Sequence, residues 1–232
     1  MTNLILGAGK LGKEISKQTG WDVLDRGVQT WFDFCDINTY FRIMSSYDTI
    51  INCVGNTNTY SNDKEGHLSV NFKAVCKLVD YCNDDKKRLV HISTDHVYCG
   101  STKPASEENI PIHSNNWYSY SKLLGDGYVQ AMAEDYLLIR TSFKPYPYPY
   151  DNAITTQKGN FDYIDIIANY IIMLIKKRAF GTYNVGTEVK TIYDLAVRCN
   201  PDVIKSDKIL NETMPRDVTM DISKLRRFIR EN

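Results

Sequence analysis

The sequence predicts an α/β fold built on a parallel β-sheet, and three observations lead to this prediction. Short runs rich in β-branched and other apolar residues alternate with longer segments of helical periodicity, the pattern of repeated β–α–β units. The first of these runs is followed at once by a glycine-rich loop that opens a helical segment. The chain has 232 residues, 43% hydrophobic and 24% charged, so it can bury a sizeable core without disulfides or metals.

The elements of the first part of the chain follow from composition and period. Apolar runs predict six strands, at residues 3–6, 22–24, 31–34, 49–53, 89–93 and 137–141. Apolar residues that recur every three to four positions predict helices between these strands, at about residues 11–19, 67–83 and 118–133. We therefore expect residues 1–143 to form one domain around a doubly wound parallel sheet.

The second part of the chain, residues 144–232, begins with alternating prolines and tyrosines at 145–150. Proline removes a backbone donor and restricts the residue before it, so we expect this run to be an extended crossover. A plain surface loop and a lid over a substrate both remain open for it. The rest predicts a small C-terminal substrate lobe, partly interleaved with the first domain, from a strand–helix unit at 161–178, a strand at 182–185 and helices at 192–199 and from 223.

Charge and cysteine usage argue against several classes of protein. Lys plus Arg (28) equals Asp plus Glu (28), which is unlike a broadly basic surface for nucleic acid or membrane lipid. The most apolar stretch, residues 164–175, is too short and too polar to span a bilayer. The six cysteines lack metal-ligand spacing, and no signal peptide precedes the first strand. We therefore expect a cytoplasmic protein with reduced thiols and no metal.

A glycine-rich loop joins the first strand to the first helix, with the sequence Gly7-Ala8-Gly9-Lys10-Leu11-Gly12. Gly7 allows the tight turn, Gly9 lets the backbone approach a pyrophosphate, and Gly12 lets the helix pack on the strand. The first helical residues, Lys10 and Leu11, offer free amides to phosphate oxygens. In this context the GxGxxG pattern predicts a Rossmann-type fold that binds a dinucleotide.

The residues that end the second strand leave the choice of cofactor open. Asp25 lies 18 residues after Gly7, where an acidic side chain meets the adenosine ribose hydroxyls of NADH. Arg26 follows it and could instead accept the 2′-phosphate of NADPH. The sequence therefore predicts a nicotinamide dinucleotide without distinguishing NADH from NADPH.

Two Tyr-x-x-x-Lys pairs occur in the chain, Tyr60/Lys64 and Tyr118/Lys122. Tyr60 lies in a polar stretch, residues 56–62, that is expected to be a loop. Tyr118 and Lys122 begin a helical segment, which places them one turn apart on one face. An ammonium at that spacing is expected to lower the pKa of the phenol, so we predict that Tyr118 and Lys122 are the catalytic pair. The hydroxyls of Ser93 and Thr94 end the fifth predicted strand at the edge where such folds bind ligands.

On these residues the chain resembles the extended short-chain dehydrogenase/reductases that act on nucleotide sugars, most closely the branch that reduces 4-keto-6-deoxy sugars. Further segments similar to this family are Cys35-Asp36-Ile37, Ile51-Asn52-Cys53-Val54-Gly55, Val70-Asn71, Ser93-Thr94-Asp95-His96-Val97-Tyr98, Arg140-Thr141-Ser142-Phe143, Tyr163-Ile164-Asp165, Gly181-Thr182-Tyr183-Asn184-Val185-Gly186, Pro215-Arg216-Asp217 and Ser223-Lys224-Leu225. The family usually reads GxxGxxG, whose first glycine would fall on Leu6, so the glycine loop departs from that pattern.

The resemblance implies a catalytic set of Tyr118, Lys122, Thr94, Asp95 and Asn71. Tyr118 would protonate the alkoxide that forms as hydride reaches the C4 carbonyl. Lys122 would lower the Tyr118 pKa and hold the nicotinamide ribose, and Thr94 would hydrogen-bond the carbonyl oxygen. Asn71 would order a water that relays protons.

The remaining implied contacts divide between cofactor and substrate. For NADPH or NADH, the loop and the resemblance together imply Gly7, Gly9, Lys10, Leu11, Gly12, Asp25, Arg26, Asp36, Ile37, Cys53, Val54, Gly55, Ser93, Tyr118, Lys122 and Ser142. For the nucleotide sugar, the resemblance implies Thr94, Asp95, His96, Phe143 and Arg216. No nucleic-acid or membrane partner is expected, and a homodimer is one option for the assembly.

Two alternatives to a reductase stay open. The 4,6-dehydratases of this family carry an Asp-Glu pair where this chain has Asp95-His96, and the epimerase-reductases carry a cysteine at the Asp95 position. The absence of both favours the reductase, although a neutral His96 could in principle act as a base toward C5. The other alternative is a non-catalytic, dinucleotide-binding regulatory subunit, because one relative of these reductases acts in that way.

Overall fold

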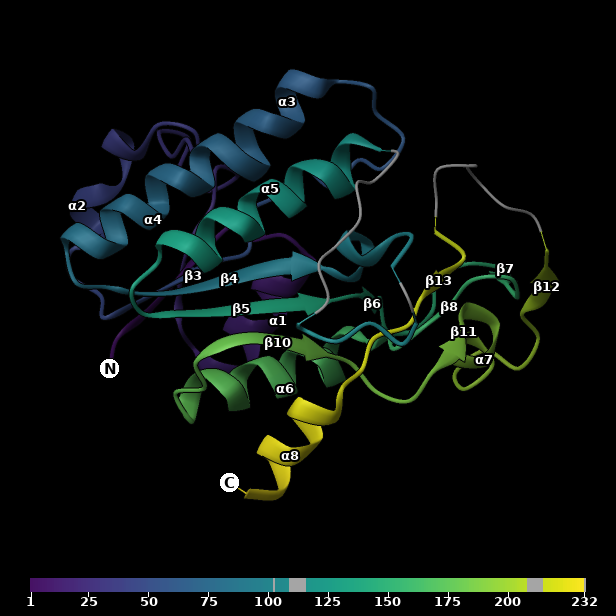
Figure 1. Ribbon diagram of the computed structural model, residues 1–232. Coiled ribbons are helices and arrows are strands. Elements are labelled where there is room, and N and C mark those ends of the chain that lie inside the picture. Colours follow the sequence, from purple (N-terminus) through teal and green to yellow (C-terminus); the bar gives the residue numbers. More distant parts are fainter. Residues whose placement is uncertain (102, 109–115, 208–214, 232) are drawn as a thin grey trace.

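The computed structural model describes residues 1–101, 103–108, 116–207 and 215–231 (Figure 1). Its centre is a six-stranded sheet of order β10-β5-β4-β3-β1-β2, in which every neighbouring pair is parallel. The strands are β1 (Asn3–Leu6), β2 (Asp22–Leu24), β3 (Thr49–Asn52), β4 (Arg88–Thr94), β5 (Tyr136–Thr141) and β10 (Gly181–Val185). The expected α/β fold with a parallel sheet is confirmed.

Helices cover both faces of this sheet (Figure 1). One face packs against α1 (Lys10–Thr19) and α6 (Ile164–Lys176), and the other against α4 (Ala74–Asp84) and α5 (Trp117–Met132). Side chains alternate between the two faces along each strand, so β1 sends Ile5 into one hydrophobic cluster and Leu4 and Leu6 into the other. Burial on both faces explains why the strands are continuous apolar runs in the sequence.

The strand order reverses between β1 and β3, which pair with each other while their chains continue to opposite sides. Ligands of open α/β sheets bind outside the carboxyl ends of the strands at such a switch point. The glycine loop after β1 and the Cys53–Gly55 segment after β3 both lie there, and a Cβ on Gly7 would come within 2.8 Å of Val54 Cγ2. The fold therefore places the predicted cofactor loop at the topological switch point.

The prediction of a strand at residues 31–34 is wrong. The segment after β2 forms turns in which Val28 and Gln29 donate to the Asp25 carbonyl and Phe32 donates to that of Gln29. Phe32 and Phe34 are buried, but they pack on Tyr40, with the Phe32 and Tyr40 ring centroids 4.9 Å apart. The apolar residues of this segment thus belong to a coil that packs on Tyr40, and β2 remains the edge strand.

The helix expected at residues 67–83 is present but is not uniform. It comprises α3 (Lys64–Leu68), a π-helical turn η2 (Ser69–Lys73) and α4, which ends at Asp84. Shorter elements of this half are η1 (Ile37–Thr39), α2 (Phe41–Met44) and η3 (Asp95–Tyr98). π-helical turns inside helices are frequent at functional sites, and this one contains Asn71.

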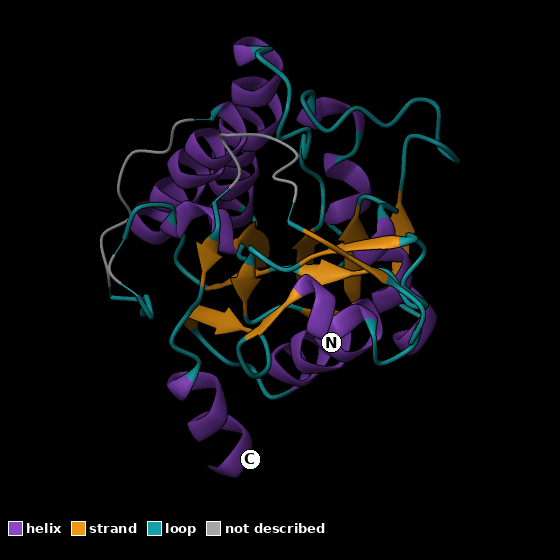
Figure 2. Ribbon diagram, turned by 90° about the vertical axis from the view of Figure 1, so that its right-hand side faces the viewer, coloured by secondary structure: helices purple, strands orange, loops and turns teal. Residues whose placement is uncertain are grey.

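The C-terminal part adds small sheets beyond the carboxyl ends of the central strands (Figures 1 and 2). Its elements are β6 (Phe143–Lys144), β7 (Asn152–Ile154), β8 (Lys158–Gly159), β9 (Asp162–Tyr163), β11 (Lys190–Thr191), α7 (Ile192–Ala196), β12 (Ile204–Ser206), β13 (Asp217–Val218) and α8 (Ser223–Glu231). The strand and helix expected at 182–185 and within 161–178 belong to the central sheet layer as β10 and α6. The helix expected to reach 199 ends at Ala196. The division at residues 143/144 stays a prediction.

The proline–tyrosine run forms neither helix nor strand, and it bends at Tyr146 and Pro147, so it is less extended than expected. Tyr148 is its buried anchor, with its backbone N–H donating to Cys199 Sγ (3.3 Å) and its hydroxyl to the Asn152 carbonyl (3.1 Å). Tyr146 and Tyr150 are exposed. The buried Tyr148 and the contact between the Tyr146 and Tyr163 rings, with centroids 5.0 Å apart, therefore both attach the run to the small hydrophobic cluster around α7.

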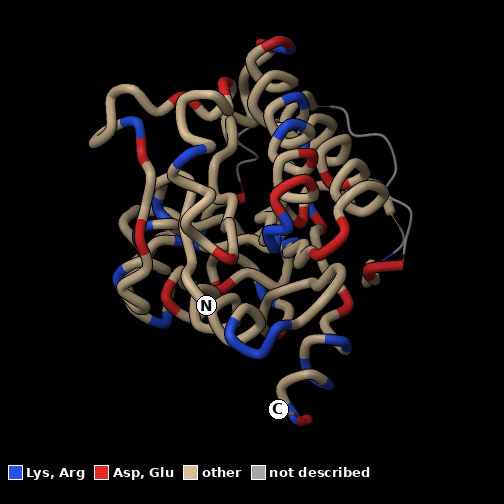
Figure 3. Tube along the Cα trace, turned by 90° about the vertical axis from the view of Figure 1, so that its left-hand side faces the viewer, with Lys and Arg blue, Asp and Glu red and all other residues tan. Residues whose placement is uncertain are grey.

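The surface carries charged residues of both signs, and the cysteines are free thiols. Basic and acidic residues are interspersed on the side of the molecule shown in Figure 3. All six cysteines are unpaired. Within the described residues, no helix is both long and apolar enough to cross a membrane.

Candidate active site

The glycine loop has the backbone that a phosphate-binding turn requires. Gly7 adopts φ = 94°, a conformation that favours glycine. A Cβ on Gly12 would collide with the Gly7 carbonyl oxygen, so this glycine permits the helix to pack on the strand. A Cβ on Gly9 would meet nothing within 4 Å, so the space in front of it is open. No side chain caps the N-terminus of α1, which leaves its first amides available to an anion.

Asp25 lies against this loop from the end of β2. Its carboxylate accepts hydrogen bonds from the Ala8 amide (3.2 Å) and the Gly27 amide (3.0 Å). Arg26, beside it, is exposed. The structure therefore brings Asp25 to the loop, and the choice between NADH and NADPH stays open.

The other residues expected on the cofactor side follow β2 and β3. Asp36 caps η1 by accepting from the Asn38 amide (3.1 Å), and Ile37 is its first residue. Cys53, Val54 and Gly55 follow β3 directly and are half-buried. Burial raises the pKa of the Cys53 thiol to about 12, so this thiol stays neutral.

Tyr118 and Lys122 lie one turn apart on α5, as predicted, and the helix is capped by the Asn116 side chain, which accepts from the Ser119 amide (2.8 Å). The Tyr118 hydroxyl forms a hydrogen bond with Thr94, the last residue of β4. Its ring lies edge-on to His96, with centroids 5.7 Å apart. The predicted tyrosine and threonine therefore meet at the carboxyl edge of the sheet.

The second Tyr-x-x-x-Lys pair is not a helical pair. Tyr60 is 54% exposed in a turn, and Lys64 is the first residue of α3. The Lys64 ammonium lies 5.1 Å from the Trp117 ring centroid. The structure thus separates the two matches in the way that the sequence context predicts.

The expected lowering of the Tyr118 pKa by Lys122 is wrong for this structure. Burial raises the pKa of Tyr118 to about 12, the Thr94 hydrogen bond opposes the rise, and the charges of Asp95 and Asp126 add to it. The Lys122 ammonium is turned toward β4, where it donates to the Ile92 carbonyl (2.8 Å). Tyr118 is accordingly a protonated phenol at neutral pH, the form that donates a proton.

Lys122 lies in a buried polar network that the sequence did not reveal. Its ammonium is 3.4 Å from His91 Nε2, and burial lowers its pKa while the neighbouring Asp126 charge raises it. Asp126 in turn accepts from Arg140 Nε at 2.9 Å, with both side chains inaccessible to solvent. Asp126 follows Lys122 by one helical turn, which is the signal that could have identified it.

The pKa values of Asp95 and His96 are strongly shifted, in opposite directions. Burial raises the pKa of the Asp95 carboxyl to about 7, although the charges of Lys144 and Lys103 and the Thr94 hydrogen bond work against this. Burial and the Lys144 charge lower the pKa of His96 to about 4, so its imidazole is neutral at pH 7. Among the described residues, Asp95 Oδ2 and His96 Nδ1 are buried atoms without a hydrogen-bond partner.

Asn71 links the loop after β3 to the catalytic helix. Its side chain accepts from the Asn56 amide (2.8 Å) and donates to the Asn56 carbonyl (2.9 Å) and to Ser121 Oγ (3.0 Å). Both N–H groups are thus used within the protein. The structure gives Asn71 a positioning role, and the water-relay role stays a prediction.

The remaining residues expected at the site are Ser93, Ser142, Phe143 and Arg216. Ser93 is buried with an unpartnered hydroxyl, and Ser142 and Phe143 are half-buried after β5. Arg216 is exposed, and its carbonyl accepts from the Lys158 amide (2.9 Å). No described residues form a group of three or more metal-ligating side chains.

The profile of the NAD dependent epimerase/dehydratase family matches residues 12–147, more than half of the chain. The chain belongs to this family. This membership confirms the resemblance to extended short-chain dehydrogenase/reductases, and the roles of the glycine loop, Tyr118 and Lys122 stay predictions.

Curated relatives match only part of this chain. A dTDP-4-dehydrorhamnose reductase of Mycobacterium tuberculosis (strain CDC 1551 / Oshkosh) is 30% identical over 154 residues, which are 60% of this chain and 49% of that protein. The chain spans about half or less of the length of the curated relatives it matches.

Solved structures match over nearly the whole chain. A hypothetical dTDP-4-dehydrorhamnose reductase from Sulfolobus tokodaii has a TM-score of 0.81 and 25% identity, with 98% of this chain and 94% of that chain covered. The fold is also that of a dTDP-4-dehydrorhamnose reductase from Bacillus anthracis str. Ames in complex with NADP, with a TM-score of 0.82, 19% identity and coverage of 98% and 92%.

Proposed function

We propose that this chain is an NAD(P)H-dependent reductase of a 4-keto-6-deoxy nucleotide sugar. The observation that carries the proposal is the meeting of Tyr118 with Thr94 at the carboxyl edge of the same sheet that holds the glycine loop. The relatives named dTDP-4-dehydrorhamnose reductase and the NADP complex among the structures of the same fold support it. A cytoplasmic location and a homodimer remain expectations.

The residues fit a nicotinamide dinucleotide. The open space at Gly9 and the uncapped N-terminus of α1 suit a pyrophosphate, and Asp25 lies where a ribose would approach. When bound, the cofactor supplies the hydride. Lys122 would have to turn from the Ile92 carbonyl to reach the nicotinamide ribose.

Tyr118 and Thr94 would carry the proton chemistry. The Tyr118 phenol, with its pKa raised to about 12, is protonated at neutral pH and donates to the alkoxide that develops at C4. The Thr94 hydroxyl donates to the same oxygen and stabilises its charge as it forms. His96, neutral and edge-on to Tyr118, limits the positions that the phenol can adopt.

The direct test is turnover with a panel of 4-keto-6-deoxy sugar nucleotides that carry dTDP, UDP or GDP. We expect NADPH or NADH absorbance to fall with at least one of them, and the product to be reduced at C4. Co-purification with a larger partner and no turnover on the panel would contradict the proposal and favour a regulatory subunit.

An epimerase or dehydratase is the second candidate, because Asp95 and His96 have unpartnered buried atoms and pKa values of about 7 and about 4. Such enzymes exchange the protons at C3 or C5. We expect no deuterium incorporation at these carbons in D₂O with substrate and oxidised cofactor. Incorporation above the rate without enzyme, lost in His96→Ala, would establish the second candidate instead.

The glycine loop can be tested without a substrate. Gly9→Val places its side chain in open space, so the fold should be retained, but the side chain fills the approach of the pyrophosphate. We expect the variant to lose the rise in Tm that NADH or NADPH gives the wild type. An equal rise in the variant would show that the dinucleotide binds elsewhere. Gly12→Ala, which collides with the Gly7 carbonyl, should instead lower Tm without any ligand.

A further inference from the structure

Lys122 and Asp126 form no direct ion pair, although both are buried on one face of α5. They are 4% and 0% exposed and lie one helical turn apart, a spacing at which an ammonium and a carboxylate can meet. Among the described residues, Asp126 pairs with Arg140 through Oδ2 (2.9 Å), and its Oδ1 atom has no hydrogen-bond partner. The Lys122 ammonium donates instead to the Ile92 carbonyl (2.8 Å). A buried carboxylate oxygen therefore stays unused one turn from a buried ammonium.

The imidazole of His91 contacts both charged groups. His91 lies on β4 and is inaccessible to solvent. Its Nε2 atom lies 3.4 Å from the Lys122 ammonium and 4.0 Å from Asp126 Oδ1. The carboxylate oxygen that a direct ion pair would use is thus the one that Nε2 already faces. The position of the imidazole therefore accounts for the missing ion pair.

Asn52 determines which nitrogen of the His91 ring carries the proton. Asn52 Oδ1 accepts from the Val54 amide (3.0 Å), so its NH₂ group faces His91 Nδ1 at 3.1 Å. Burial and the Lys122 charge lower the pKa of His91 well below its usual value, so the ring is neutral and has one N–H. Because Nδ1 is the acceptor, this N–H is on Nε2. It offers Lys122 no acceptor, and it brings the positive end of a dipole to Asp126 Oδ1 in place of the ammonium.

We propose that His91 is a positioning residue whose imidazole keeps the Lys122 ammonium apart from Asp126 and so leaves it available to a bound dinucleotide. The inference rests on the role of Lys122 in the proposed function. On the Ile92 carbonyl the ammonium uses one of its three N–H bonds, and one hydrogen bond can be exchanged for another to a ribose hydroxyl. A buried ion pair with Asp126 would hold Lys122 much more strongly, because separating such a pair leaves uncompensated charges.

The first test needs no ligand and compares crystal structures of the wild type, His91→Ala and His91→Gln. Without the ring, we expect the Lys122 ammonium to leave the Ile92 carbonyl and to lie about 3 Å from Asp126 Oδ1, a normal charge-assisted hydrogen bond. Gln at position 91 can present an amide N–H in place of Nε2–H, so Lys122 should stay on Ile92. A Lys122 ammonium that stays on the Ile92 carbonyl in His91→Ala overturns the inference.

The second test measures Kd of NADPH and NADH for the wild type, His91→Ala, Lys122→Met and the double variant. Lys122→Met should raise Kd about 10- to 100-fold, the effect of losing one hydrogen bond to a charged group, and His91→Ala should act in the same direction by up to the same factor. Because His91 acts through Lys122, adding His91→Ala to Lys122→Met should change Kd by less than about two-fold. His91→Gln should bind within a few-fold of the wild type.

An equal effect of His91→Ala in both backgrounds would mean that His91 only supports the fold, and it would overturn the inference, as would an unchanged Kd in the single variant. Should His91→Ala not fold, His91→Ser takes its place with the same criteria.

These outcomes separate the inference from the reductase activity. If both tests succeed and the wild type reduces no sugar nucleotide, the proposed activity fails and the inference stands. If reduction occurs but Lys122 stays on the Ile92 carbonyl in His91→Ala, the reductase stands and the inference fails. A wild type that binds neither dinucleotide overturns both.

Discussion

Replacing Tyr118 with phenylalanine is expected to lower kcat for sugar-nucleotide reduction by about 10²- to 10⁴-fold, the usual contribution of a positioned proton donor. The aromatic ring and its edge-on contact with His96 at 5.7 Å remain, so only the hydroxyl that bonds to Thr94 is lost. Binding of NADPH should change little. Steady-state oxidation of NADPH with the substrate identified from the panel measures the first quantity, and titration of NADPH the second.

The matched control for this variant is Tyr60→Phe in the other Tyr-x-x-x-Lys pair. Tyr60 is exposed in a turn and contributes only its backbone N–H, which donates to Asn58 Oδ1 (3.1 Å). Turnover should stay within a few-fold of the wild type. A damaging Tyr60→Phe together with a silent Tyr118→Phe would contradict the placement of the active site on α5.

The parallel sheet could be predicted because strands that are buried on both faces appear in the sequence as continuous apolar runs. The segment at residues 31–34 misled the same reasoning, since alternating burial of Phe32 and Phe34 looks like a strand edge. Only backbone hydrogen bonds decide between a strand and a coil, and here they are made locally, within the turns after Asp25. The π-helical turn at Asn71 was missed for a similar reason, because helical periodicity does not report a local change of hydrogen-bond register.

The geometry of the candidate site could be predicted from the sequence for residues whose conformation is determined locally. The φ of Gly7, the open space at Gly9 and the helical spacing of Tyr118 and Lys122 depend on neighbours in sequence. The Tyr118 pKa depends instead on burial and on charges from β4 and α5, so spacing alone gave the wrong direction.

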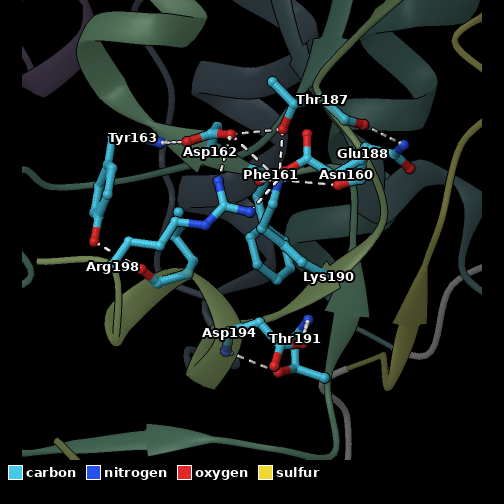
Figure 4. Close-up of polar contacts among 11 residues, drawn as sticks. Asn160, Phe161, Asp162, Tyr163, Thr187, Glu188, Lys190, Thr191, Asp194 and Arg198 are labelled. Carbon is cyan, nitrogen blue, oxygen red and sulfur yellow. Dashed lines mark hydrogen bonds and ion pairs between the residues drawn. The ribbon is translucent and has the colours of Figure 1, made fainter. Parts of the chain in front are cut away.

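The largest loss of stability is expected from Lys190, the buried cation at the centre of the cluster in Figure 4. Its ammonium donates to the Phe161 carbonyl (3.0 Å), to the Glu188 carbonyl (2.9 Å) and to Thr187 Oγ1 (2.5 Å), and it pairs with Asp162 at 3.2 Å. Lys190 and Asp162 are each 3% exposed. The favourable contacts of the pair offset the cost of burying both charges only while both partners are present.

Lys190→Met should therefore lower the free energy of unfolding by about 3–5 kcal/mol, because the Asp162 carboxylate stays buried and keeps only the more distant Arg198, at 3.9 Å, as a counter-ion. Lys86→Met is the control, since Lys86 pairs with Glu134 at 3.3 Å and the two side chains are 77% and 64% exposed. An exposed pair contributes at most about 1 kcal/mol. Urea unfolding followed by circular dichroism measures both. Equal losses in the two variants would mean that Lys190 does not compensate a buried charge, and that β9 is held by packing around Phe161 and Tyr163 instead.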